Sequence, residues 1–210
     1  MRLGVISDIH GDFSSLEKAW SHLHRLKVDR VVCAGDLVDY GPEPDRVVEF
    51  LTHHNIVAVR GNHDRWALRR GPNGIDEFGG ATPNQASLDA LGRLPPYALI
   101  SEMRHVSVIV HGSPHSDMEF VQPYSHSAAQ LEDYLQQLSA DILIYGHTHE
   151  PAWYRCEKGL VMNPGSIASL PTVESSRSFA IIDMDAHTVT FHAVETGEEF
   201  EVQPWPVDEA

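Results

Sequence analysis

The first 60 residues alternate short apolar runs with helix-like segments, and this alternation constrains the fold more than any other feature of the chain. Apolar runs of strand length occupy residues 3–6, 31–34 and 56–59, and apolar residues recur at helical spacing between them. A βαβαβ order predicts parallel strands joined by right-handed crossovers, so the loops that follow the strands lie along one edge of a sheet. Ligands of open α/β sheets usually bind at that edge.

The rest of the chain is predicted to continue the same domain. Residues 65–96 are rich in helical pattern and loops, and we interpret them as an insertion or lid. Asp185-Ala186-His187 suits a hairpin turn, which predicts an antiparallel pair at the end of the chain. With no repeat or linker, residues 1–210 are expected to form a single domain. Further strands are predicted at 97–100, 106–110, 142–145, 160–162, 179–183 and 188–194, with one helix at 127–138.

Composition limits the partners. No apolar run reaches the roughly 18 residues of a membrane span, and Ser7-Asp8 follows the first apolar run too early for a signal peptide, so we expect a cytoplasmic protein with no membrane partner. A net charge of -15 without clustered Lys and Arg argues against a long nucleic-acid partner. Small phosphate substrates stay possible, because bound cations reverse the local field where carboxylates converge. Cys33 and Cys156 are unpatterned and are expected to be reduced thiols.

Acidic residues and a histidine follow the first two predicted strands directly. Asp8 and His10 come after the first, and because side chains alternate along an extended backbone, residues two apart can share a metal. Asp36 and Asp39 come after the second. Crowded carboxylates are costly without cations or hydrogen bonds, so a bridging metal ligand is a natural role for one of them. The alternatives are an ordinary surface loop for residues 8–10 and a turn or helix cap for Asp36.

The same pattern returns after three more predicted strands. Asn62 and His63 follow the third strand, His111 follows residues 106–110, and His147 and His149 follow residues 142–145. Asn62 can offer its amide oxygen to a metal, and His63 can serve as a proton donor. Histidine is the commonest neutral metal ligand near physiological pH, and the last two histidines can address one metal or two neighbouring metals. Five strand ends therefore bring metal-compatible groups to one rim.

These segments resemble the ordered motifs of calcineurin-like metallophosphoesterases. The matching segments are Ser7-Asp8-Ile9-His10, Gly35-Asp36-Leu37-Val38-Asp39, Gly61-Asn62-His63-Asp64, His111-Gly112 and Gly146-His147-Thr148-His149. Residues 39–44 and 163–166 resemble the small single-domain prokaryotic phosphodiesterase branch, so the resemblance covers nearly the whole chain. It implies an α/β fold, a four-layer α/β/β/α sandwich of two mixed β-sheets flanked by helices.

The resemblance also implies a site for two divalent metal ions. It assigns Asp8, His10, Asp36 and His149 to one ion and Asp36, Asn62, His111 and His147 to the other, with Asp36 as the bridge. Two such ions can hold an attacking hydroxide between them and clamp the phosphoryl oxygens. His63, oriented by Asp39, is expected to stabilise the phosphoryl group or protonate the leaving oxygen. Mn is the expected metal, and Fe, Zn, Ni or Co also suit oxygen and imidazole ligands.

The expected activity is hydrolysis of small phosphodiesters or phosphomonoesters. The family's phosphoprotein phosphatases carry arginine after the residue matching Asp39, but Tyr40 stands here, which argues against their substrate clamp. Arg65 is the preferred phosphate contact because it closely follows His63. Aromatic residues can stack on an aromatic leaving group or nucleobase, or can close the edge of a core. The candidates for both roles are Tyr40, Trp66 and Tyr124.

A rival function is a catalytically silent metal-binding or scaffold module of the same fold. That hypothesis predicts damaged motifs, whereas every motif position is intact here. Among the other histidines, His22 and His24 face different directions on a helix and are expected at the surface. His115 and His126 are expected at the lip of the site. The sequence does not indicate an oligomeric state.

Overall fold

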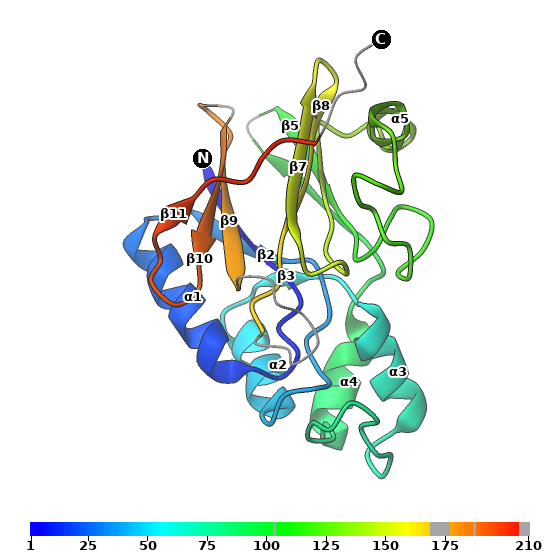
Figure 1. The fold of residues 1–210 in the computed structure, drawn as a ribbon. Coiled ribbons are helices and arrows are strands. Elements are labelled where there is room, and N and C mark those ends of the chain that lie inside the picture. Colours follow the sequence, from blue (N-terminus) through cyan, green and yellow to red (C-terminus); the bar gives the residue numbers. More distant parts are fainter. Residues whose placement is uncertain (103, 169–176, 187, 206–210) are drawn as a thin grey trace.

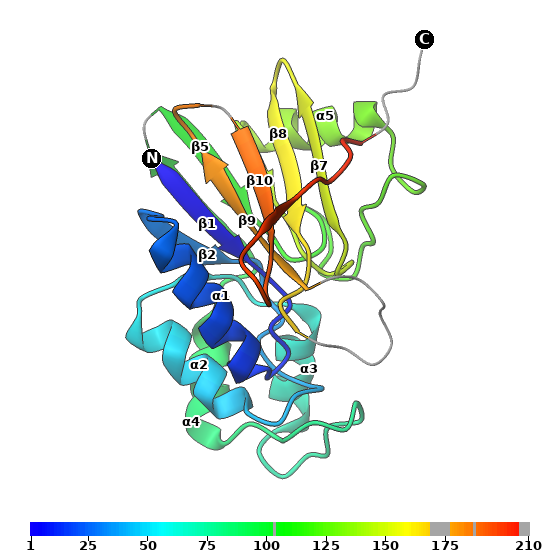
Figure 2. The same cartoon turned by 60° about the vertical axis from the view of Figure 1, so that its left-hand side comes forward.

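The computed structural model describes residues 1–102, 104–168, 177–186 and 188–205, and its sheets and helices stack in four layers (Figures 1 and 2). Three clusters of buried apolar side chains separate the layers, one under the helices of the N-terminal half, one between the two sheets, and one under the helix of the second half. The predicted α/β/β/α sandwich of two mixed sheets is confirmed. Among the described residues, no helix combines the length and the apolar character that a membrane crossing requires.

The first sheet has the strand order β11-β10-β9-β1-β2-β3. Strands β1, β2 and β3 pair in parallel, and β9 adds antiparallel to the other side of β1. The first strand is therefore central, and the predicted βαβαβ unit is confirmed. The elements are β1 (Arg2–Ile6), α1 (Phe13–Arg25), β2 (Arg30–Cys33), α2 (Pro44–His53), β3 (Val57–Ala58), β9 (Ser178–Asp183), β10 (Thr188–Ala193) and β11 (Glu199–Phe200).

The second sheet has the order β4-β5-β6-β8-β7, with three parallel central strands and antiparallel strands at both edges. Helix α5 covers its outer face through Leu131, Tyr134 and Leu135. The parallel strands of both sheets end at the same side of the molecule, where the candidate site lies (Figure 1). The elements are β4 (Ala98–Glu102), β5 (His105–Ile109), α5 (Ala128–Leu138), β6 (Ile142–Ile144), β7 (Pro151–Cys156) and β8 (Gly159–Pro164).

Residues 65–96 supply the end of helix α3 (Asn62–Arg70), a loop at 71–84, and helix α4 (Gln85–Arg93). As predicted, Leu88 and Leu91 are buried, and they join the apolar cluster under the N-terminal helices. The segment is thereby packed onto the domain, beside α2 in Figure 1. Its role as a lid stays a prediction.

The structure corrects or tests three local predictions made from the sequence. Strands β7 and β11 were missed, because β7 begins at a proline, which weakens a strand pattern, and β11 has two residues. His22 was wrongly expected at the surface, since it is buried and stacks on the ring of Phe179, whereas His24 is exposed. The Asp183 carboxylate accepts the backbone N–H groups of Asp185 and Ala186, which starts the predicted hairpin turn, and His187 lies outside the described residues.

Candidate metal centre

The loops after β1 and β2 are fastened to each other by backbone hydrogen bonds. The N–H groups of Ile9 and His10 both donate to the carbonyl oxygen of Asp36, at 2.9 and 3.0 Å, and that of Asp8 donates to Gly35 at 3.0 Å. The side chains of these two loops consequently meet at the shared edge of the sheet. The prediction that strand ends would bring Asp8, His10 and Asp36 together is confirmed by their geometry.

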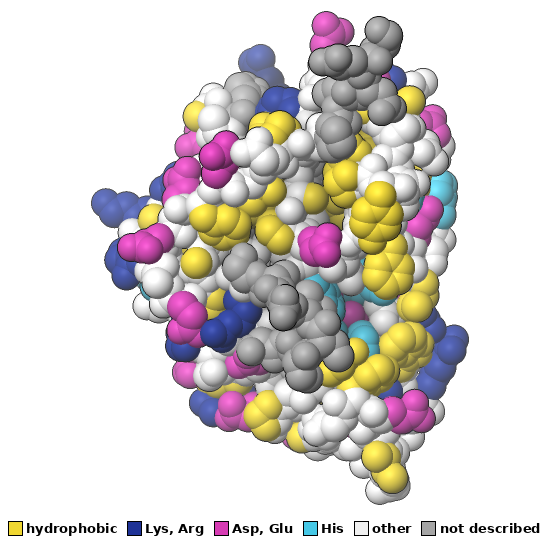
Figure 3. All heavy atoms as spheres, viewed as in Figure 1, with side chains coloured by type: hydrophobic (Ala, Val, Ile, Leu, Met, Phe, Trp, Pro, Cys, Tyr) yellow, Lys and Arg dark blue, Asp and Glu magenta, His cyan; other side chains and the backbone are white. Residues whose placement is uncertain are grey.

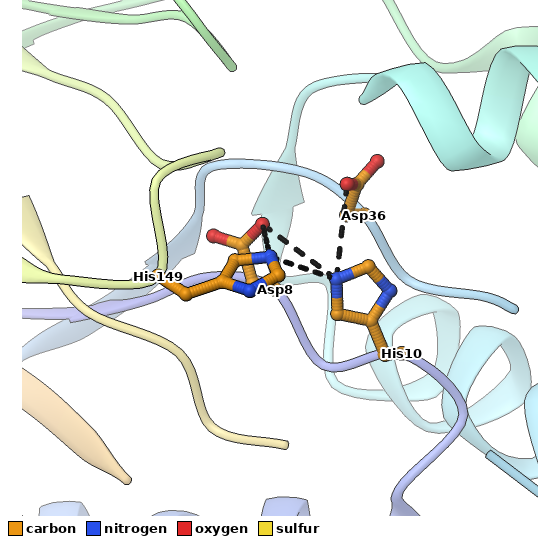
Figure 4. Close-up of side chains that lie close together, drawn as sticks. All are labelled: Asp8, His10, Asp36 and His149. Carbon is orange, nitrogen blue, oxygen red and sulfur yellow. Dashed lines mark hydrogen bonds and ion pairs between the residues drawn. The ribbon is translucent and has the colours of Figure 1, made fainter. Parts of the chain in front are cut away.

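A first group of metal-compatible side chains consists of Asp8, His10, Asp36 and His149, whose donor atoms all lie within 4.8 Å of one another (Figure 4). His149 Nε2 lies 3.2 Å from Asp8 Oδ1 and 3.1 Å from His10 Nε2. His10 Nε2 lies 3.8 Å from Asp36 Oδ2. Two facing imidazole nitrogens between two carboxylates form an arrangement that one cation can satisfy.

A second group consists of Asp36, His111 and His147, again within 4.8 Å of one another. His111 Nε2 lies 3.1 Å from Asp36 Oδ2 and 2.9 Å from the amide oxygen of Asn62. Asn62 therefore faces the same point. Asp36 belongs to both groups, which is the position expected of a carboxylate shared by two ions.

Unpaired polar atoms test whether these residues fit cations. Among the described residues, eight buried side-chain atoms lack a hydrogen bond, and three of them are Asp8 Oδ1, Asp36 Oδ2 and His147 Nε2. The two carboxylate oxygens have imidazole nitrogens at 3.2 and 3.1 Å, as ion-pair contacts. Buried polar atoms are normally satisfied, and each unsatisfied one calls for an explanation. All three belong to residues of the two groups described above, so bound cations would satisfy them. The residues present fit two divalent ions.

The backbone at these positions is held in an uncommon conformation. A positive φ is rare for residues other than glycine, and residues in such strained conformations occur mostly at functional sites. It is adopted here by five of the seven predicted ligands, with values from 47° to 67°: Asp8, His10, Asp36, His147 and His149.

Two positions beside the site require glycine because there is no room for a side chain. A Cβ atom on Gly61 would lie 2.1 Å from Asp36 Oδ1, and one on Gly146 would lie 2.7 Å from Asp8 Oδ2.

The metal-free site holds ionised carboxylates beside imidazoles of both protonation states. Burial lowers the pKa of His10 to about 4, so its imidazole is neutral at pH 7. Burial alone would raise the pKa of Asp36, but the neighbouring His111 holds it well below its usual range. Burial alone would lower the pKa of His111, but Asp36 raises it to about 10, so a cation that binds His111 has to displace a proton.

The predicted pair of His63 and Asp39 is in contact at the border of the first group. His63 Nδ1 lies 2.9 Å from Asp39 Oδ2, and the rings of His63 and His10 are 4.9 Å apart. The other oxygen of Asp39 pairs with Arg70, a residue that the sequence analysis missed. A helical signal was available, because residues 63 and 70 are two turns apart and share one face of α3.

Further polar side chains brace the loops of the site. Asp64, which stood in a matching segment but was given no role, accepts the backbone N–H groups of Asp36, Leu37 and Gly61 at 2.8 to 3.1 Å. Asn163 donates to the carbonyl oxygen of Gly146 at 2.8 Å. Residues 163–166 had entered the sequence analysis only through the family resemblance, and their hydrogen bonds give them a physical role.

The structure separates the other candidates. Tyr40 borders the site, with its ring 5.1 Å from that of His63. Arg65 is already paired with Asp117 through contacts of 2.6 and 3.0 Å. Arg177 bonds to Ser15 and Glu195, outside both groups. The two histidines expected at the lip contact their own loop and helix α5. His126 hydrogen-bonds to Glu119 and Tyr134, and His115 packs on the ring of Tyr134.

The surface above the two groups is visible from one side. Figure 3 shows histidine and acidic side chains in a depression that is bordered by hydrophobic side chains. Phe120 is 52% exposed, and its ring lies 4.4 Å from that of His147, so it borders the second group.

Comparison with known proteins agrees with the geometry. The profile of the calcineurin-like phosphoesterase superfamily domain matches residues 1–187. The chain is 25% identical over 199 residues to the phosphodiesterase YfcE of Escherichia coli K12, covering 90% of this chain and 91% of that protein. It is 26% identical over 180 residues to a phosphodiesterase of Methanocaldococcus jannaschii, covering 82% of this chain and 90% of that protein. A metallophosphoesterase structure from Sphaerobacter thermophilus superposes with a TM-score of 0.72 and 27% identity over 92% of this chain and 87% of its own.

Proposed function

Because the chain belongs to the calcineurin-like phosphoesterase superfamily, we propose that it is a binuclear metal-dependent enzyme that hydrolyses small phosphodiesters in preference to phosphomonoesters. The observation that carries the proposal is the position of Asp36 in both groups of metal-compatible side chains. Asp8, His10, Asp36 and His149 would hold one ion, and Asp36, Asn62, His111 and His147 the other. Mn is the proposed metal, and the oxygen and imidazole donors also accept Fe, Zn, Ni or Co.

When bound, the ions would supply an activated water and positive charge for the phosphoryl oxygens. His63 would act on the leaving group. Its Nδ1 is held by Asp39 at 2.9 Å, which leaves Nε2 to donate a proton to the leaving oxygen or a hydrogen bond to the phosphoryl group. Asp39 fixes the orientation of the ring, and Arg70 in turn holds Asp39.

The preference for a diester rests on charge and on the relatives. A monoester dianion carries more negative charge than a diester and needs an additional cationic partner. Arg65 and Arg70 are each paired with a carboxylate already, so neither is a free clamp for that charge. The relatives from Escherichia coli and Methanocaldococcus jannaschii are both named phosphodiesterases.

A cytoplasmic location and a small phosphate-ester partner complete the proposal. Cys33 and Cys156 are both free thiols, which suits a reducing compartment. The net charge of -15 does not favour a long nucleic acid.

The test combines metal analysis with kinetics. The chelated protein is reloaded with Mn, Ni, Co, Zn or Mg and assayed on a generic diester, the corresponding monoester and nucleotides. We expect faster turnover of the diester and two bound ions per chain. His63→Ala should keep both ions and lower kcat by about 10²- to 10⁴-fold, as expected for loss of a general acid.

His24→Ala is the matched control, because His24 is exposed on α1 and takes no part in the site. Unchanged turnover in His63→Ala would reject its role. A metal-loaded protein that hydrolyses none of these esters would favour the silent scaffold module instead.

A further inference from the structure

An aromatic cluster lies beside His63 and is not used by the proposed chemistry. The rings of Trp66 and Phe78 lie 4.7 and 4.6 Å from the His63 ring. They stack on each other at 5.8 Å with an interplanar angle of 14°. Tyr40 backs the cluster, with its ring 4.8 Å from that of Phe78. The cluster therefore adjoins the imidazole that would protonate the leaving group.

Phe78 reaches this position from a loop that is built around one buried carboxylate. Asp76 is 6% exposed and accepts the backbone N–H groups of Phe78 and Gly80 at 2.8 and 2.9 Å. It also accepts the N–H of Tyr40 at 3.0 Å, and so ties loop 71–84 to the loop that follows β2. The hydrogen bonds fix the Phe78 backbone next to the candidate site.

The cluster forms one wall of a cavity of about 320 Å³, which we call the Trp66–Phe78 pocket; its lining residues are Trp66, Arg69, Arg70, Glu77 and Phe78. This volume is within the range of small-ligand sites. The pocket combines two aromatic rings with the guanidinium group of Arg69 and the carboxylate of Glu77, while Arg70 is held by Asp39. A nucleobase has both the flat face and the hydrogen-bonding edge that such a lining can engage, whereas a plain hydrocarbon ring has only the face.

We propose that the Trp66–Phe78 pocket binds the nucleobase of a nucleoside leaving group, an inference that rests on the proposed phosphodiesterase function. The pocket lies on the His63 side, where the leaving oxygen would receive its proton. A nucleoside carries its base one sugar ring away from its 5′ oxygen, which suits a pocket whose two aromatic rings lie 4.7 and 4.6 Å from the His63 ring. The substrate class is therefore a diester whose departing alcohol is a nucleoside.

The experiment compares two diesters with the same leaving oxygen. One is methyl phosphate joined to the 5′ oxygen of adenosine, and the other is methyl phosphate joined to the 5-oxygen of 1-O-methylribose, which lacks the base. Because the two alcohols leave equally well, a difference in kcat/KM reports the base. We expect about a tenfold advantage for the adenosine diester, the effect of one base–aromatic stack, with adenosine and methyl phosphate as products.

Variants locate the effect. Trp66→Leu and Phe78→Leu should each bring the two kcat/KM values within about twofold of one another, with the melting temperature recorded to monitor folding. Phe120→Leu is the matched control, because Phe120 is an aromatic residue at the other border of the site, beside His147, and should keep the tenfold ratio.

Several outcomes would overturn the inference. Release of AMP and methanol, or loss of the ratio only in Phe120→Leu, would place the base on the opposite side. Equal loss on both diesters in both pocket variants would make the cluster a packing element. Equal rates on the adenosine diester and on methyl benzyl phosphate would reject recognition of a nucleobase. If the wild type hydrolyses both diesters at equal rates, only the proposal for the pocket is rejected. If it hydrolyses neither diester, the proposed function is rejected as well.

Discussion

Replacing Asp36 by asparagine tests whether one carboxylate serves two ions. The substitution keeps the shape of the side chain and the Oδ1 atom that accepts the His63 backbone N–H at 2.8 Å, but it removes the negative charge. Asp36 Oδ2 belongs to both groups of metal-compatible side chains. Asp36→Asn should therefore weaken the binding of both ions, and not of one ion alone.

The size of the effect follows from ligand linkage. Metal at about 100 times its Kd stabilises the folded protein by about 2.7 kcal/mol per site, or about 5 kcal/mol for two sites. In a chain of this length 1 kcal/mol shifts the melting temperature by about 2–4 °C, so metal should raise that of the wild type by about 10–20 °C. If the loss of the shared charge weakens each site about 100-fold, each contributes only about 0.4 kcal/mol at the same concentration. The rise should then fall below about 4 °C.

The assay is calorimetric melting of chelated protein with and without added MnCl2, together with the metal content of each sample. Asp39→Asn is the control, because Asp39 lies on the same loop but in neither metal group, and it should keep the full rise. A rise of half the wild-type size in Asp36→Asn would show that Asp36 serves one ion only. A full rise would refute the assignment of Asp36 as a metal ligand.

Two further predictions concern residues around the ions. Asp39→Asn should lower kcat by about 10²- to 10⁴-fold, because an amide does not replace the carboxylate that orients the His63 ring, and Arg70→Leu should lower kcat by less. A double-mutant cycle in which the two effects simply add would contradict the contact between Asp39 and Arg70. In chelated protein, the pKa of His10 is about 4 in the folded state and near 6.5 in the unfolded state. The unfolded state therefore binds the proton more tightly, and the folded state loses stability as the pH falls from about 6.5 to 4. Denaturant unfolding from pH 7 to pH 4 should show a loss of up to about 3 kcal/mol from His10 that is absent in His10→Gln, and identical pH profiles would exclude this contribution.

The sequence predicted the parts of the site that depend on strand ends. Asp8, Asp36 and His147 each follow an apolar run of strand length, and parallel pairing carries such positions to one edge. Periodicity could not reveal Asp64 or Asp76, because their partners are backbone N–H groups of loops whose path is set by tertiary packing.

Other differences arise where local pattern is weak or overridden. Strand β7 begins at Pro151, which weakens a strand pattern in the sequence, and its pairing with β8 at the sheet edge stabilises it. His22 is buried because α1 also faces the part of the sheet built by β9, which comes from the far end of the sequence. Arg65 was chosen for its nearness to His63 in sequence, but Asp117 from a distant loop pairs with it.

The central place of β1 also bears on when the site is completed as the chain folds. Its neighbour β9 is made of residues 178–183, and the carbonyl oxygens of Ser7 and Asp8 accept hydrogen bonds from Ile167 and Ala168. Strand β1 and the loop after it, which carries the first two candidate ligands, therefore have these partners only once residue 183 has been synthesised. Contacts so far apart in sequence form late, so a growing chain would expose an incomplete site for most of its synthesis and gain affinity for metal at the end.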